Sequence, residues 1–263
     1  MKKLFKMSAV ILFVLIVFSA CGRNESVSGK ITSFPPYRER VVTAIGDSIA
    51  AGYGLDSQED NYLTLFSDNI GAVLNNDAVS GYDSGEVLKS LSDEKTAADI
   101  KNADAIVVSV GGNDFFHRKD IMIDALKNAL LHGEGFFPEE VTNIYDEYEK
   151  NLSRIIDEIK NMNPDAYIIV QTVYNPFLKQ TLNFSYINVG KTANRYVTRL
   201  NDSIKNVCKT KNRVFVFDVA PEMNEDAENF YGTDEKLDIH PTKHGHATLA
   251  RVFTEKFNGL LKD

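Results

Sequence analysis

The chain has 263 residues, of which 43% are hydrophobic, so it is long enough to form one domain with a substantial core. Its formal charge is −8, and it contains no stripe rich in lysine and arginine, which argues against nucleic acid as a partner. It has two cysteines, Cys21 and Cys208, and the second lies in a helical pattern that suits a small buried apolar residue.

Residues 1–20 have the pattern of a signal peptide. A basic start with three lysines leads into an apolar run over 7–18, which is too short to span ~30 Å of hydrocarbon as a helix. The small residues before Cys21 resemble a bacterial lipobox, in which the cysteine carries the lipid. Ordinary secretion with cleavage nearby, or an uncleaved anchor, is the alternative. We therefore expect lipidation at Cys21, a polar tether over 21–39, and a location on the extracytoplasmic face of a bacterial cell membrane.

Residues 40–263 form the predicted globular domain, in which strands alternate with helices. The predicted strands are 41–45, a short one within 75–81, 103–110, 167–173 and 214–217. The predicted helices include 61–70, 121–131, 141–162, 192–207 and 244–261, and loops are expected over 174–189 and 221–237. Because most strand runs are continuously apolar, we expect a parallel sheet covered by helices on both faces.

Polar residues follow several of these strands. Ser48 comes where Gly46 ends the first strand and a helix begins, so it either caps that helix or acts as a nucleophile above free helix N–H groups. Gly81 closes the loop after the second strand, Asn113 follows the third, and His240 precedes the last helix. Since the carboxyl ends of parallel strands meet at one edge of a sheet, we expect these residues to converge.

Acyl transfer needs a set of groups of this kind. It requires a nucleophile, a base within hydrogen-bond reach, a group that orients the base, and donors for the oxyanion. Ser48 offers the hydroxyl, and His240 is the candidate base because an ordinary histidine titrates near neutrality. The predicted oxyanion hole consists of the backbone N–H groups of Ser48 and Gly81 and the side-chain amide of Asn113, with Gly85 as a rival for Gly81.

In order and spacing, these residues resemble the four blocks of the GDSL-type, or SGNH, serine hydrolase family. The blocks are Gly46-Asp47-Ser48, Gly81, Gly111-Gly112-Asn113-Asp114 and His240-Pro241. The run GDSIAAGYGL looks like the thioesterase/lysophospholipase and arylesterase branch, and the resemblance covers residues 40–263. It implies a three-layer α/β/α sandwich of flavodoxin-like type, with Ser48 as nucleophile, His240 as general base, and Gly81 and Asn113 as oxyanion donors.

One position departs from the family pattern. The family usually has an aspartate three residues before its histidine, but here that position is Leu237, and Asp238 stands two residues before His240. A shifted turn would let Asp238 reach the ring nitrogen, which is the hypothesis that we favour. Asp234 from further back, or a backbone carbonyl near Leu237, are the alternatives.

Two other functions compete with an esterase. The tail residues Asp238, His240, His244 and His246 suggest a zinc site, but Pro241 interrupts the helical spacing, so we expect neither a metal nor a cofactor. A non-catalytic binding module on the same scaffold is the second alternative.

The substrate stays open at this point. Lysophospholipids, short or medium acyl esters and thioesters are the expected classes, and carbohydrate O-deacetylation is the alternative. The segment 115–141 carries four phenylalanines, which either form a mobile flap over an acyl pocket or belong to the core.

Overall fold

The computed structural model describes residues 39–132, 137–178, 183–184, 187–231 and 238–261. The predicted signal peptide and Cys21 lie outside the described residues, and so does nearly all of the tether. Among the helices that are described, none combines the length and the apolar character needed to cross a membrane.

A five-stranded parallel sheet lies at the centre of the fold, with the strand order β2-β1-β3-β4-β7. Its strands are β1 (Arg40–Gly46), β2 (Ala72–Asn76), β3 (Ala105–Ser109), β4 (Tyr167–Gln171) and β7 (Val214–Phe217). Counted along the chain this is the order 2-1-3-4-5, which is that of flavodoxin-like sheets. The crossovers change direction between β1 and β3, and ligands bind at such a point outside the carboxyl ends of the strands.

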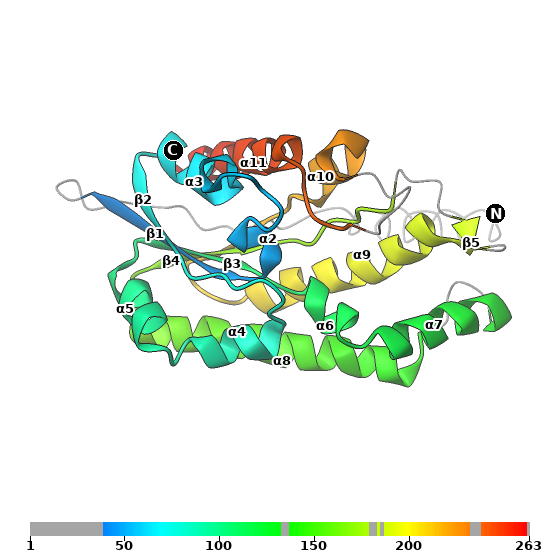
Figure 1. Ribbon diagram of the computed structural model, residues 1–263. Helices are drawn as coiled ribbons and strands as arrows, with labels where there is room; N and C mark the ends of the chain where they lie inside the picture. The colour runs from blue at the N-terminus through cyan, green and yellow to red at the C-terminus, as the bar shows by residue number, and fades with distance from the viewer. Residues whose placement is uncertain (1–38, 133–136, 179–182, 185–186, 232–237, 262–263) are drawn as a thin grey trace, which may run out of the picture.

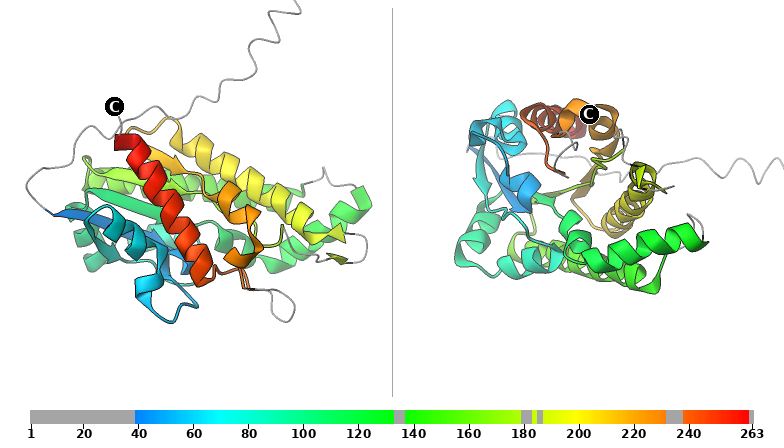
Figure 2. Two further views of the ribbon diagram at one scale, coloured as in Figure 1. Left: turned by 90° about the horizontal axis from the view of Figure 1, so that it is seen from above. Right: turned by 45° about the vertical axis from the view of Figure 1, so that its right-hand side comes forward.

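Helices cover both faces of the sheet (Figures 1 and 2). One layer consists of α3 (Tyr62–Asn69), α10 (Ala220–Glu225) and α11 (Lys243–Leu261). The other layer consists of α4 (Ser84–Ser90), α5 (Glu94–Asn102), α8 (Glu139–Met162) and α9 (Val189–Cys208). The predicted three-layer α/β/α sandwich with a central parallel sheet is therefore confirmed.

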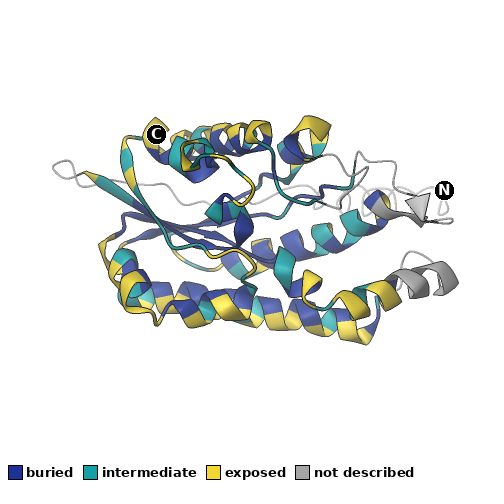
Figure 3. Cartoon of the chain, in the orientation of Figure 1, coloured by how far each residue is buried: buried dark blue, intermediate teal, exposed yellow. Residues whose placement is uncertain are grey.

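Each face of the sheet has its own apolar core, because successive side chains of a strand point in opposite directions. In β3, Ile106 and Val108 belong to the core beneath α8, whereas Ala105 and Val107 belong to the core beneath α11. Figure 3 shows the central strands buried, with exposed residues on the outer faces of the helices. Cys208 is a buried free thiol within the first of these cores, as its pattern predicts.

Three expectations about local structure were wrong. The second strand is Ala72–Asn76 rather than part of 75–81, because an edge strand is only half buried and lacks a continuous apolar run. The supposed loop 221–237 contains α10, which begins beside a proline, and the short 3-10 helix η2 (Ala227–Asn229). The supposed loop 174–189 contains a small hairpin of β5 (Asn183–Phe184) and β6 (Ile187–Asn188).

The remaining elements lie around the carboxyl edge of the sheet. They are α2 (Ser48–Ala51), the 3-10 helix η1 (Gln58–Asp60), α6 (Gly112–Phe116) and α7 (Lys119–His132). Of the segment 115–141, most is therefore helical, and residues 133–136 lie outside the described part of the chain.

Candidate active site

Ser48 is the first residue of α2 and follows β1 after a tight turn. Gly46 makes that turn possible, since its φ is +153° and a Cβ there would lie 2.1 Å from the carbonyl oxygen of Ser109. Asp47 is the residue that caps α2, because its Oδ1 accepts the N–H of Ile49 at 3.0 Å. The alternative in which Ser48 is merely the cap is therefore wrong, and the hydroxyl of Ser48 has another partner.

That partner is His240. Its Nε2 lies 2.9 Å from Oγ of Ser48, and its Nδ1 lies 2.7 Å from Oδ1 of Asp238. The same Oδ1 accepts the backbone N–H of His240 at 3.0 Å. This bond, from the residue two positions on, makes an Asx-turn. Of the three groups considered for orienting the ring, the structure places Asp238 against it. Asp234 and Leu237 lie outside the described residues.

The chain around His240 contacts two other parts of the protein, the segment at Asn229 and Phe230 and the ring of Tyr53. Pro241 forms a β-bridge with Phe230, and the N–H of Thr242 donates to the carbonyl of Asn229 at 2.9 Å. The ring of Tyr53 lies over the imidazole, with a distance of 4.6 Å between the ring centroids. These contacts hold the imidazole where its Nε2 meets the hydroxyl of Ser48.

The three predicted oxyanion donors differ in their placement. Ser48 lies at the N-terminus of α2, where a backbone N–H has no acceptor within the helix. Asn113 lies in α6 and lines the same cavity as Ser48, and its Nδ2 donates one hydrogen to the carbonyl of Tyr82 at 2.9 Å, which leaves the second hydrogen for a ligand. Gly81 is joined to the site through its neighbour Tyr82 but does not itself line the cavity.

Of the two glycines considered for the loop between β2 and α4, Gly81 lies in the loop and Gly85 does not. The φ of Gly81 is +92°, a conformation that favours glycine, although a Cβ there would meet nothing within 4 Å. Gly85 lies inside α4 and has no such backbone requirement.

Sequence reasoning missed the contacts that fasten this loop to α6. The carboxylate of Asp114 accepts the hydroxyl of Ser84 at 2.5 Å and the N–H of Ser84 at 3.1 Å. Burial raises the pKa of Asp114 to about 6, against the effect of these bonds from Ser84. Burial likewise raises the pKa of Asp47 to about 7, although its hydrogen bond from Ile49 lowers it.

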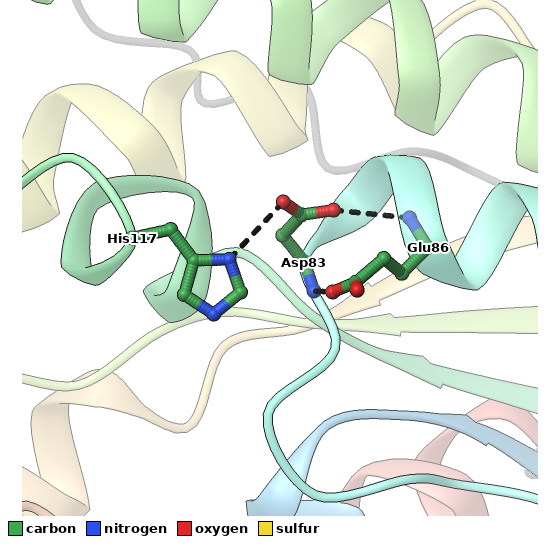
Figure 4. Close-up of side chains that lie close together, drawn as sticks. All are labelled: Asp83, Glu86 and His117. Carbon is green, nitrogen blue, oxygen red and sulfur yellow. Dashed lines mark hydrogen bonds and ion pairs between the residues drawn. The ribbon is translucent and has the colours of Figure 1, made fainter.

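Figure 4 shows a second contact between the loop and α6. Oδ2 of Asp83 lies 3.3 Å from Nδ1 of His117. Oδ1 of Asp83 caps α4 by accepting the N–H of Glu86, whose carboxylate accepts the N–H of Asp83 in return. The three side chains lie close enough together to hold a metal ion, but a capping box and one ion pair account for their arrangement. The spacing Asp83-x-x-Glu86 is the signal that predicts this cap.

The tail histidines considered for zinc have separate partners. Nε2 of His244 lies 3.1 Å from Oδ2 of Asp226, and Nδ1 of the buried His246 accepts the N–H of Tyr62 at 3.2 Å. Burial lowers the pKa of His246 to about 4, so this imidazole is neutral at pH 7. Because His240 faces Ser48 and Asp238, the three rings do not converge on one point.

A cavity of about 410 Å³ opens beside Ser48, a size within the ~300–1,000 Å³ range of small-molecule sites. The apolar walls come from α6, α7, α9 and the segments after β3 and β4. They are formed by Val110, Phe115, Phe116, Met122, Ile123, Val173, Phe177, Tyr196, Val197 and Leu200. Asp47, Asn113, Gln171 and Asn175 are among its polar residues. The arrangement thus combines an activated hydroxyl, amide donors and a large apolar space.

The phenylalanines of the segment 115–141 divide between core and cavity. Phe115 is buried and packs edge-on against Tyr145, and Phe137 packs against Tyr145 and Tyr196. Phe116 is exposed at the cavity, and Phe136 lies outside the described residues.

Known proteins resemble this chain in sequence and in fold. Residues 44–248 match the GDSL-like Lipase/Acylhydrolase family. The chain is 26% identical over 270 residues to the uncharacterized protein YpmR of Bacillus subtilis (strain 168), covering 99% of each chain. It is 23% identical to the spore germination lipase LipC of Bacillus licheniformis, over 84% of this chain and 97% of LipC. Among solved structures it resembles the lipase Lip_vut3 from a goat rumen metagenome, with a TM-score of 0.67 and 18% identity, over 85% of this chain and 100% of the other. The chain therefore belongs to the GDSL-like lipase/acylhydrolase family and is an esterase-lipase enzyme that acts on ester bonds.

Proposed function

We propose that this enzyme hydrolyses acyl esters derived from lipids, such as lysophospholipids or medium-chain esters and thioesters. The observation that carries the proposal is the apolar cavity of about 410 Å³ beside Ser48. An acetyl group would leave most of this space unfilled. A longer acyl chain would gain ~0.8 kcal/mol for each CH₂ group that it removes from water.

The proposed reaction proceeds through an acyl-enzyme on Ser48. Nε2 of His240 takes the proton of the serine hydroxyl while Oγ attacks the ester carbonyl, and Asp238 stabilises the imidazolium that forms. The N–H groups of Ser48 and Gly81 and the amide of Asn113 receive the negative charge on the carbonyl oxygen. His240 then protonates the leaving alcohol or thiol, and it activates the water that releases the acid.

A fluorophosphonate probe tests whether the site is catalytic. We expect the folded chain to be labelled at Ser48 and the variant Ser48→Ala to remain unlabelled. Absence of labelling in the folded wild-type protein would favour a non-catalytic binding module.

A series of p-nitrophenyl esters from C2 to C16 tests the substrate class. If each added methylene is buried in the cavity, kcat/KM should rise by up to roughly fourfold per CH₂ until the cavity is full. A preference for C2 over C8 would contradict a lipid substrate and would favour carbohydrate O-deacetylation. Thioesters and lysophospholipids of the preferred chain length would then separate the remaining classes.

We further propose that the enzyme is anchored to a membrane through a lipid on Cys21. Support comes from the sequence alone, since a basic start, an apolar run and small residues precede this cysteine. Two or three acyl chains give stable anchoring, unlike a single chain. We therefore expect Cys21→Ala to release the enzyme from membranes in a fractionation experiment, and unchanged retention would contradict the anchor.

A further inference from the structure

We propose that the mouth of the acyl cavity docks onto a phospholipid bilayer, so that substrate passes from the membrane into the cavity. The docking surface, called here the α7 rim, consists of Phe116, Lys119, Met122 and Ile123. The inference rests on the proposed function, because it takes the occupant of the cavity to be a lipid acyl chain.

The first argument is that two large apolar side chains of the rim face water. Phe116 is 47% exposed and Ile123 is 48% exposed, yet both also line the apolar cavity. Single exposed apolar residues are common on protein surfaces, but these two both line the same apolar cavity. Inserting them into the bilayer would remove their surface from water and would continue the apolar wall of the cavity into the lipid.

The second argument concerns Lys119. It is exposed, it lines the cavity, and the described part of the chain offers it no hydrogen-bond or ion-pair partner. Lys119 and Ile123 are four residues apart in α7 and therefore lie on one face of the helix. A lysine at this place can lay its apolar stem on the rim and extend its ammonium group to the lipid phosphates.

Charge alone does not drive this docking. Asp120 and Asp124 are exposed on the same helix, and Arg118 is engaged with Glu147 at 2.6 Å. The net charge near the rim is thus not positive, and attraction to anionic lipids would be weak. We therefore expect the insertion of apolar side chains to be decisive and zwitterionic phosphatidylcholine to be sufficient.

The predicted tether joins the domain at the end that lies away from the rim. The domain begins with Arg40 at the end of β1 that is remote from Ser48, and in Figures 1 and 2 the helix α7 lies at the opposite end of the molecule. The chain from Cys21 to residue 39 would reach up to roughly 60 Å when extended. A lipid on Cys21 would therefore hold the domain near the bilayer while allowing its far end to face the lipid.

Tryptophan fluorescence tests the proposal directly, because the chain contains no tryptophan. The full chain carrying Ser48→Ala, to prevent turnover, receives Phe116→Trp as its only reporter. The matched control carries Leu261→Trp, at a 38% exposed position at the C-terminal end of α11. Both are incorporated into phosphatidylcholine vesicles whose acyl chains carry bromine, a quencher of indole.

A docked rim places the reporter at position 116 at the level of the acyl chains, about 5–10 Å into the boundary with the headgroups. We expect its emission to shift to the blue and its quenching to exceed that of the control several-fold. Adding Ile123→Ser to the Phe116→Trp chain should weaken both effects. Equal quenching at the two positions, or none at either, would overturn the proposal.

Two further outcomes are informative. A blue shift at position 116 without quenching by bromine would mean that another copy of the chain covers the rim, and it would overturn docking onto lipid. Because the fluorescence is measured without turnover, a C2 preference in the ester series would refute the proposed substrate and leave the quenching unchanged. The two failures are therefore distinguishable.

Discussion

The contact between Asp238 and His240 makes Asp238→Asn the most informative substitution for testing how the base is oriented. As a carboxylate, Asp238 only accepts hydrogen bonds, so its contact of 2.7 Å requires the proton on Nδ1 and leaves Nε2 free to accept the proton of Ser48. An asparagine that turns its NH₂ group towards Nδ1 favours the opposite tautomer, in which Nε2 carries the hydrogen and cannot act as a base.

The expected loss follows from the exposure of the pair. For a buried aspartate in a serine protease the same change lowers kcat by ~10⁴. Here the side chain of Asp238 is 37% exposed and that of His240 is 18% exposed, so water screens their interaction. We therefore expect kcat/KM to fall by about 10³, which corresponds to about 4 kcal/mol of transition-state stabilisation.

The assay is hydrolysis of p-nitrophenyl butyrate from pH 5 to pH 9, with the melting temperature as a check on folding. Asp234→Asn is the matched control, since it removes the same charge from the same region and should leave kcat/KM within a factor of two of wild type, about 0.4 kcal/mol. If Asp238→Asn retains activity within about fivefold of wild type, or about 1 kcal/mol, another group orients His240 and the reasoning is refuted.

Two further substitutions test the surroundings of Ser48. Asn113→Ala should lower kcat by about 10²–10³ with little change in KM, because its amide acts on the transition state, and an equal rise in KM in steady-state kinetics would contradict that role. Asp47→Asn tests a buried carboxyl whose pKa lies at about 7 instead of 3.8. Between these values the folded state binds more protons than the unfolded state, so the free energy of unfolding falls as the pH rises, by up to about 4 kcal/mol above pH 7. Asn does not titrate, so Asp47→Asn should gain stability relative to wild type between pH 4.5 and pH 8 in urea unfolding, and parallel pH profiles would contradict the raised pKa.

The central layer of the fold was predictable because its strands are buried on both faces. Such strands read as continuous apolar runs, as in 103–110, and the amphipathic stripe of α8 is equally plain. The edge strand β2 and the short helix α10 gave weaker signals, since the first is half covered and the second depends on packing against α11. The local sequence pattern thus predicts elements that are buried in the core, and it fails for elements whose conformation depends on packing against distant parts of the chain.

The positions of Ser48, Asn113 and His240 were predictable because strand ends carry the site in this class of fold. The contacts around them were not. Ser84 and Asp114 are 30 residues apart, and nothing in either neighbourhood indicates that they pair. The cavity is equally non-local, because its walls come from α7 and α9, which lie far apart in the sequence.

The displaced aspartate shows how a local turn can replace an expected spacing. Nδ1 is the ring nitrogen nearer the backbone, and an aspartate two residues earlier naturally accepts the backbone N–H of the histidine. In this structure Oδ1 of Asp238 does both, at 3.0 Å from the backbone nitrogen and 2.7 Å from Nδ1 of His240. An acid held in this way can meet Nδ1 but not Nε2, so the ring can turn only Nε2 towards Ser48. The tautomer that a base requires is therefore specified within residues 238–240, whichever residue stands at position 237.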